Sequence, residues 1–191
     1  MNNENPMRFW DLVYSDLVRK EALFQPSASP PHKRKGIYLK ALSPRSLPVF
    51  LYRCAFYFRK TPLRFLSHLF SLANYLFFGL EIAMDCRIGP GLFLAHTQGT
   101  VIGAYEIGRN AVIYQGVTLG AKSLSFAFDS EHRPTIGNDV VIGAGAKILG
   151  GVTIHDNAQI GANAVVVTSV PQSAVVGGVP AKILKFLDDK A

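Results

Sequence analysis

Residues 136–166 place an aliphatic side chain at every sixth position. The six positions are Ile136, Ile142, Ile148, Ile154, Ile160 and Val166. A period of six fits neither a helix, with 3.6 residues per turn, nor a single strand, with two. It predicts a parallel β-helix, in which each hexapeptide gives one short strand and one turn and the aliphatic residue points inward. Asn, Asp and Gly suit the turns because they tolerate positive φ. These turn residues are Asn138, Asp139, Asp156, Asn157 and Asn163.

The same period extends toward the N-terminus with one change of phase. It runs through Ile82, Ile88 and Leu94, weakens at Thr100, and resumes in a shifted register at Ile107, Ile113 and Leu119. We expect a corner near residues 103–106 to absorb the shift. The period is lost at residues 121–134, which we predict to be an extruded loop, and such loops are often functional. The predicted β-helix spans residues 81–176, and a C-terminal tail or short helix follows at residues 177–191.

Residues 1–80 read as an N-terminal α-helical module. Apolar spacing predicts a helix over residues 7–24 and two more between residues 49 and 80, separated near Thr61 and Pro62. Residues 25–48 are rich in proline and contain the basic run 33–35, which indicates a linker. Aromatic residues are dense over residues 49–80. Helix packing and subunit contact are the main interpretation, and contact with lipid is the alternative.

Positive charge is concentrated in the helical module. Residues 1–80 contain twelve Lys or Arg and four Asp or Glu, whereas residues 81–191 contain eight and nine. The excess indicates either a solvated surface or contact with an anionic membrane or an acidic partner. We expect no nucleic-acid partner.

The two cysteines, Cys54 and Cys86, are far apart and form no CxxC motif. They indicate a reduced, cytoplasmic chain without a metal site. The N-terminus lacks the pattern of a secretory signal. Residues 65–80 are apolar, but sixteen residues fall short of the roughly 20 that span a bilayer. We therefore expect a cytoplasmic protein, with the inner face of the membrane as an alternative location.

His96 is the main candidate for chemistry. It lies two positions after the inward Leu94, where the strand gives way to a turn and a side chain should point outward. A lone histidine more often has a structural role. Glu81 lies fifteen residues earlier, so one coil of about eighteen residues would bring it into an adjacent coil near His96. A carboxylate on one ring nitrogen raises the basicity of the other, as a general base requires. His132, in the loop, is a second candidate.

Several segments carry a family resemblance. They are LFLAHTQGTVIG, VIYQGVTLGAK, RPTIGNDVVIGAGAKILGGVTI, IGANAVVV and GGVPAKIL. In these segments the chain resembles the hexapeptide-repeat acyltransferases, and among them the serine acetyltransferase-like branch. The resemblance implies a left-handed β-helix, a homotrimer with active sites between subunits, and acetyl-CoA as co-substrate. It implies that His96 is the general base and that Glu81 supports it. The implied CoA contacts are Gly120, Ala121, Ala144, Ala162, Thr168 and Lys182.

The chain departs from that branch at the positions expected to bind the acceptor. Ala95 stands where the branch has an Asp before the catalytic His. His132 and Arg133 stand in exchanged order relative to the Asp-Arg-His-Pro of the branch. The helical module is also shorter, so both a single trimer and a dimer of trimers stay open. In these features the chain looks more like the acetyltransferases of capsule and exopolysaccharide synthesis.

The sequence therefore predicts an acetyl-CoA-dependent O-acetyltransferase with L-serine as the family's default acceptor. A sugar hydroxyl is the alternative acceptor. Two other classes stay open: an N-acyltransferase acting on an amino sugar, and a non-catalytic trimeric β-helix that serves as a scaffold. An outward histidine near an acid argues against the scaffold.

Overall fold

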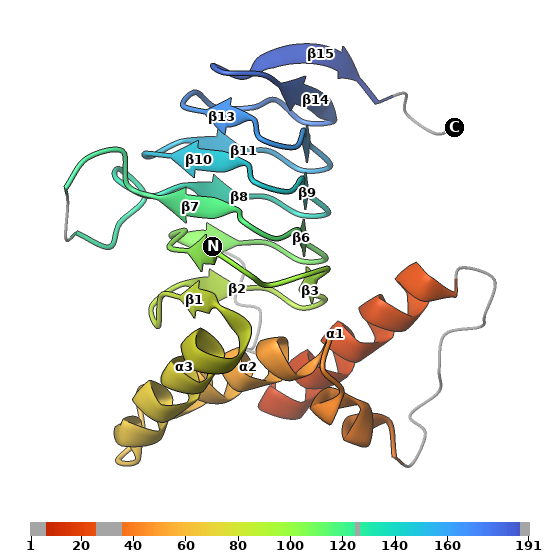
Figure 1. Ribbon diagram of the computed structural model, residues 1–191, viewed down its shortest axis with the longest axis vertical. Coiled ribbons are helices and arrows are strands. Elements are labelled where there is room, and N and C mark those ends of the chain that lie inside the picture. Colours follow the sequence, from red (N-terminus) through yellow and green to blue (C-terminus); the bar gives the residue numbers. More distant parts are fainter. Residues whose placement is uncertain (1–6, 26–35, 125–126, 188–191) are drawn as a thin grey trace.

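The computed structural model describes residues 7–25, 36–124 and 127–187. Its N-terminal helices lie at one end of a β-helix (Figure 1). The helical elements are α1 (Phe9–Phe24), the 3-10 helix η1 (Ile37–Leu42), α2 (Leu47–Phe58) and α3 (Arg64–Phe78). The three predicted helices are thus present. Part of the predicted linker forms η1, and its basic run at residues 33–35 lies outside the described residues.

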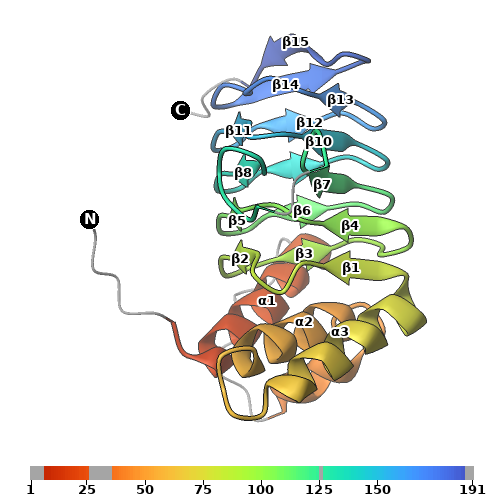
Figure 2. The same cartoon turned by 90° about the vertical axis from the view of Figure 1, so that its left-hand side faces the viewer.

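Short strands stack into three sheets, parallel except for the last strand, β15, and the sheets form the faces of a prism (Figures 1 and 2). Sheet I contains β1 (Leu80–Ile82), β4 (Thr100–Ile102), β7 (Thr118–Gly120), β10 (Lys147–Leu149) and β13 (Val165–Val166). Sheet II contains β2 (Arg87–Ile88), β5 (Glu106–Ile107), β8 (Thr135–Ile136) and β11 (Thr153–Ile154). Sheet III contains β3 (Phe93–Leu94), β6 (Val112–Ile113), β9 (Val141–Ile142), β12 (Gln159–Ile160), β14 (Ala174–Gly177) and β15 (Lys182–Phe186). The chain passes from sheet I to II to III in about five left-handed coils, which confirms the predicted fold class.

The interior is filled by the predicted repeat positions. The six aliphatic side chains of residues 136–166 are at most 3% exposed. Alanines four positions later, such as Ala146 and Ala164, are fully buried beside them. A column of identical small and branched side chains packs without large voids, so the period of six directly specifies the core.

The change of phase is divided between two corners, of which only the one at residues 103–106 was predicted. Ile102, not Thr100, pairs with the inward positions Ile82 and Leu119 of the adjacent coils. Ile102 follows Leu94 by eight residues, so the two extra residues lie at residues 95–99, which form the corner that contains His96. The corner at residues 103–106 is one residue shorter than the repeat of six requires, because Ile107 follows Ile102 by five residues. A corner can take extra residues because it lies outside the strand pairing.

The two ends of the β-helix are covered differently. The helical module covers the end at β1. At the other end, residues 182–186 form β15, which pairs antiparallel with β14. Residues 182–186 of the predicted tail are thus a strand and not a short helix. The open backbone groups of β14 explain the difference, because an unpaired edge is satisfied by a returning strand. Residues 121–124 and 127–134 leave the coil between β7 and β8 (Figure 1).

A buried ion pair fastens the helical module to the first coil. The guanidinium of Arg53 in α2 donates to both carboxylate oxygens of Asp16 in α1, at 2.9 and 3.0 Å. The same guanidinium donates to the carbonyls of Ile88 and Gly89, each at 2.6 Å. Asp16 in turn accepts the backbone N–H of Leu92 at 2.9 Å. Two helices and one coil therefore share a single pair of charges.

We expect both cysteines to be unreactive in the folded protein. Cys54 and Cys86 are free and buried. Burial raises the pKa of the Cys54 thiol to about 11 and that of Cys86 to about 12. Because the thiolate is the reactive form, Ellman's reagent near neutral pH should detect no rapidly reacting thiol before denaturation and two afterwards. A thiol that reacts rapidly in the native protein would contradict the buried placement.

Candidate active site

His96 lies in a column of stacked corners between sheets III and I. The column consists of residues 95–99, 114–116, 143–145 and 161–163, one corner from each successive coil. Backbone hydrogen bonds of 2.8–3.0 Å join each corner to the next: Gly116 N–H to Gln98, Gly145 N–H to Gln115, and Asn163 N–H to Ala144. This His96 column therefore brings Ala95 and His96 into line with two of the predicted CoA contacts, Ala144 and Ala162. Lys182, opposite Gly177 in the β14–β15 pair, lies at its far end.

The imidazole of His96 is exposed, as expected for a residue at a corner. Glu81 points outward from β1, where it pairs with Val101 in the next coil. The corner touches the start of β1, because the Gly99 N–H donates to the Gly79 carbonyl at 3.0 Å. Within the described part of this chain, no hydrogen bond or ion pair joins Glu81 to His96. The supporting role of Glu81 stays a prediction.

The His96 column carries small residues at most of its turn positions, and Tyr114, which is 39% exposed, is its largest exposed side chain. Gly99, Gly116 and Gly145 each have φ near +70°, which other residues rarely adopt. Above Gly116, Lys147 donates to its carbonyl at 2.5 Å and to Thr118 Oγ1 at 3.1 Å. Small residues allow a slender chain such as pantetheine to lie against the backbone. The exposed cation at Lys182 suits a phosphate, so the column fits the CoA moiety.

The remaining predicted contacts lie in a second column, between sheets I and II. We call it the loop column, because the chain leaves the coil there at Ala121 and returns at Pro134. Gly120 ends β7 and accepts the Gly150 N–H at 2.9 Å from the next coil. Ala121 begins the loop, and Thr168 follows β13 at the same side. The structure thus divides the predicted CoA contacts between the two edges of sheet I.

The loop presents His132 in a fixed orientation. Its Nδ1 lies 2.7 Å from Asp129 Oδ1, which also accepts the backbone N–H groups of Glu131 and His132. The hydrogen bond from His132 lowers the pKa of the Asp129 carboxyl, with the backbone donors adding to the effect. Asp129 is therefore ionised at neutral pH and directs the other ring nitrogen, Nε2, away from itself.

Arg133 fastens the loop to the coil. Its guanidinium donates to the carbonyls of Ala127 and Gly103, each at 3.0 Å, and lies 4.7 Å from the centre of the Phe128 ring. The loop exit is thereby held against the preceding coil. The acceptor-binding role of Arg133 stays a prediction.

Three polar residues near these columns escaped the sequence analysis. Asp129 could have been found from its spacing of three residues before His132. Lys147 directly precedes the inward Ile148, so the sequence predicts its place on a strand. It does not predict the hydrogen-bond partners of its ammonium group. Gln115 lies in the His96 column, and its Oε1 is buried without a hydrogen-bond partner among the described residues. Nothing in the sequence separates Gln115 from an ordinary turn residue.

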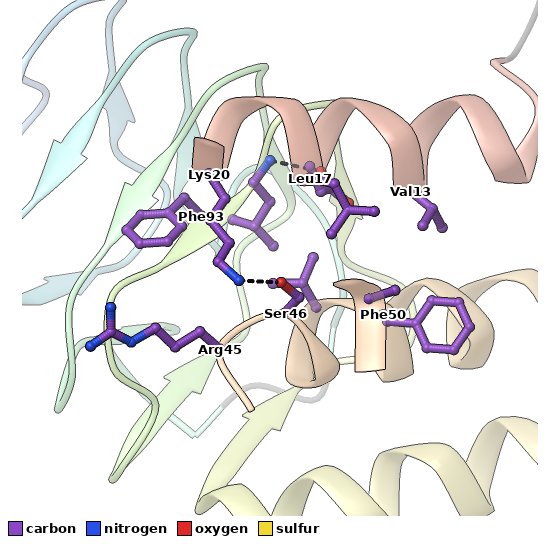
Figure 3. A pocket seen from close by; sticks show the side chains of 11 residues that line it. Val13, Leu17, Lys20, Arg45, Ser46, Phe50 and Phe93 are labelled. Carbon is purple, nitrogen blue, oxygen red and sulfur yellow. Dashed lines mark hydrogen bonds between the residues drawn. The ribbon is translucent and has the colours of Figure 1, made fainter. Parts of the chain in front are cut away.

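A separate pocket lies between α1, the start of α2 and β3 (Figure 3). Apolar side chains such as Val13, Leu17 and Phe50 line one part. Lys20 and Arg45 lie at the other, where Lys20 donates to Ser46 Oγ at 2.9 Å. Burial lowers the pKa of the Lys20 ammonium, and the charge of Arg45 adds to this shift. The lining includes none of the predicted site residues, so the two columns remain the candidate active site.

Comparison with known proteins gives a consistent result. The family model described as bacterial transferase hexapeptide (six repeats) matches residues 133–168. A serine acetyltransferase of Helicobacter pylori (strain J99) is 41% identical over 134 residues, which cover 70% of this chain and 77% of the relative. One from Staphylococcus xylosus is 46% identical over 121 residues, covering 63% of this chain and 55% of the relative.

Solved structures agree with these relatives. The crystal structure of Neisseria gonorrhoeae serine acetyltransferase matches with a TM-score of 0.78 and 31% identity, covering 95% of this chain and 68% of that one. A serine acetyltransferase in complex with CoA matches with a TM-score of 0.75 and 29% identity, covering 92% and 69%.

Proposed function

Because this chain belongs to the serine acetyltransferase family of hexapeptide-repeat proteins, we propose that it transfers acetyl from acetyl-CoA to the hydroxyl group of L-serine. The observation that carries the proposal is the identity of 41% over 77% of a serine acetyltransferase. The exposed His96, at a widened corner of the column that fits CoA, supports it. Bound acetyl-CoA supplies the acetyl group as an activated thioester.

His96 acts as the general base. Its neutral imidazole accepts the proton of the serine hydroxyl while the oxygen attacks the thioester carbonyl carbon. A C–O bond forms, the C–S bond breaks, and the proton passes through His96 to the departing sulfur. Backbone N–H groups at the corner stabilise the oxyanion. Glu81 assists by holding the imidazolium.

We propose a homotrimer in which two subunits share each site. The support is the separation of the predicted residues in one chain: His96 lies at one edge of sheet I, and His132 with Gly120 and Ala121 lies at the other. A neighbouring subunit that places its loop column beside the His96 column brings the two sets together. Light scattering on the purified chain tests the trimer and distinguishes it from a dimer of trimers.

A sugar hydroxyl is the second candidate acceptor, as in capsule or exopolysaccharide synthesis. Ala95 removes the carboxylate that would pair with the amino group of serine, and the exchanged order of His132 and Arg133 alters the loop exit. Arg133 is also engaged by Gly103 and Ala127, which leaves fewer donors for a serine carboxylate. These features favour a neutral acceptor.

The acceptor is tested by competition. The protein is incubated with acetyl-CoA and an equimolar mixture of L-serine, nucleotide sugars and oligosaccharides, and products are identified by mass spectrometry. We expect O-acetylserine as the main product. If the products contain acetylated sugar but no O-acetylserine, the acceptor is a sugar and not L-serine. The Ala95→Asp variant is the matched control, since it should shift products further toward serine.

We propose a cytoplasmic location. Two buried free thiols suit a reducing compartment, and acetyl-CoA is a cytoplasmic metabolite. Fractionation of cells that produce the protein tests this proposal.

A further inference from the structure

Helix α3 has its polar and apolar faces reversed relative to an ordinary surface helix. Two of its polar side chains point into the protein, since Ser67 and Asn74 are 1% and 3% exposed, whereas His68 is exposed. Ser67 donates to the Ala55 carbonyl at 2.7 Å, and Asn74 donates to the Pro48 carbonyl at 3.0 Å, so both bond to α2. A surface helix normally turns its apolar stripe to the core and its polar residues to water.

Phe70 and Phe78 of α3 pack inward, on Phe58 and on the core, but several other apolar side chains of the helix point outward. The exposed ones at the same face are Phe65, Leu69, Leu72 and Leu76, each between 51% and 64% exposed. Their spacing of four, three and four residues places them in one stripe along the helix. Tyr75 and Phe77, at 61% and 75%, extend the stripe near its end. Soluble proteins rarely expose a contiguous apolar surface of this kind without a partner.

Positive charge adjoins the stripe at one end. Lys60 and Arg64 are exposed at the start of α3, and residues 65–80 carry no charged side chain. The helical module as a whole has eight more basic than acidic residues. An anionic surface attracts such a module. The charge therefore makes an anionic surface the complementary partner for this face of α3.

We propose that α3 is an interfacial helix that docks the protein on an anionic lipid membrane. Its apolar stripe inserts among the headgroups, and Lys60 and Arg64 contact the lipid phosphates. The described helices include none long and apolar enough to cross a bilayer, so attachment is peripheral. α3 lies at the end of the molecule opposite β15 (Figures 1 and 2), where it is accessible to a flat surface.

Docking would bring the His96 corner close to the bilayer. Gly79 directly follows α3, and its carbonyl accepts the Gly99 N–H of that corner. The membrane-binding element and the candidate catalytic residue are therefore joined by one hydrogen bond and a short stretch of chain. The proposal concerns location and does not depend on which acceptor is used.

Vesicle flotation tests the proposal with the full chain. Vesicles of phosphatidylcholine alone are compared with vesicles that also contain phosphatidylglycerol. We expect binding to the anionic vesicles that weakens as salt is raised. The Leu72→Glu/Leu76→Glu variant should bind at least about tenfold more weakly, because each leucine loses its favourable burial in lipid. Leu124→Glu is the matched control, since Leu124 is a fully exposed leucine of the loop.

Two results would overturn the proposal. One is equal vesicle binding by wild type and the double variant, or no binding by either. The other is an assembly without lipid that is two or more times the mass of the double variant's, which would make α3 a contact between copies. Circular dichroism must first show that the variant is folded. Acetyl transfer is assayed without lipid, so failure of docking and failure of the proposed activity are separate outcomes.

Discussion

Replacing His96 with alanine should lower kcat/KM for acetyl transfer to L-serine by roughly 100- to 10,000-fold, the range that a general base contributes. The imidazole is exposed at a corner, so its removal leaves the core and the backbone hydrogen bonds of the His96 column unchanged. The loss should therefore appear in kcat, with the affinity for CoA and the melting temperature close to those of the wild type. Steady-state kinetics measures the loss in kcat, and calorimetric titration with CoA measures the affinity for CoA.

His155→Ala is the matched control. His155 is also exposed at a corner of the β-helix, but it lies between sheets II and III, away from both columns. Its replacement should leave turnover within about twofold of wild type, as surface substitutions usually have small effects. If both variants lose activity equally, or if His96→Ala stays active, His96 is not the base.

Replacing Arg53 with alanine should destabilise the folded protein by about 3–5 kcal/mol, because it leaves Asp16 buried and unpaired. Arg53 and Asp16 are 2% and 8% exposed at their side chains. Four groups would lose a donor: the two carboxylate oxygens and the carbonyls of Ile88 and Gly89. Urea unfolding followed by circular dichroism measures the loss, and the helical signal should disappear first.

Two control variants test whether the loss of stability comes from the unpaired buried charge, and whether it requires that the ion pair be buried. The Asp16→Leu/Arg53→Met variant removes both charges and should be more stable than the Arg53→Ala single variant, because no buried charge is left alone. Arg109→Ala breaks a surface pair with Asp139 at 3.5 Å and should change stability by about 1 kcal/mol at most. A similar small change in Arg53→Ala would show that the ion pair does not hold the module to the coil.

The period of the sequence was sufficient to predict the β-helix and its interior. Each repeat unit between Ile82 and Val166 consists only of a short strand and a turn. The local sequence pattern is therefore enough to specify the fold of this region. The outward placement of His96 followed from the same register. The location of the two extra residues at the His96 corner could not be predicted from the register. Thr100 lies six residues after Leu94 and is also buried, so it looks like a repeat position.

Contacts between distant segments were beyond the sequence. Asp16 stands between Val13 and Leu17 on the buried face of α1, which marks it as unusual, but its partner Arg53 lies 37 residues away. The reversed faces of α3 depend on which side α2 covers, and an apolar helix gives no sign of that choice. The division of the candidate site between two columns appears only when the coils are stacked.

The release of CoA thiol from acetyl-CoA with L-serine as acceptor tests the central claim most directly. The buried cysteines should not react with the thiol reagent, so the signal reports CoA alone. We predict release that requires serine, saturates with it, and is lost in His96→Ala. No release with serine, together with no detectable CoA binding, would contradict the account and favour a β-helix that serves as a scaffold.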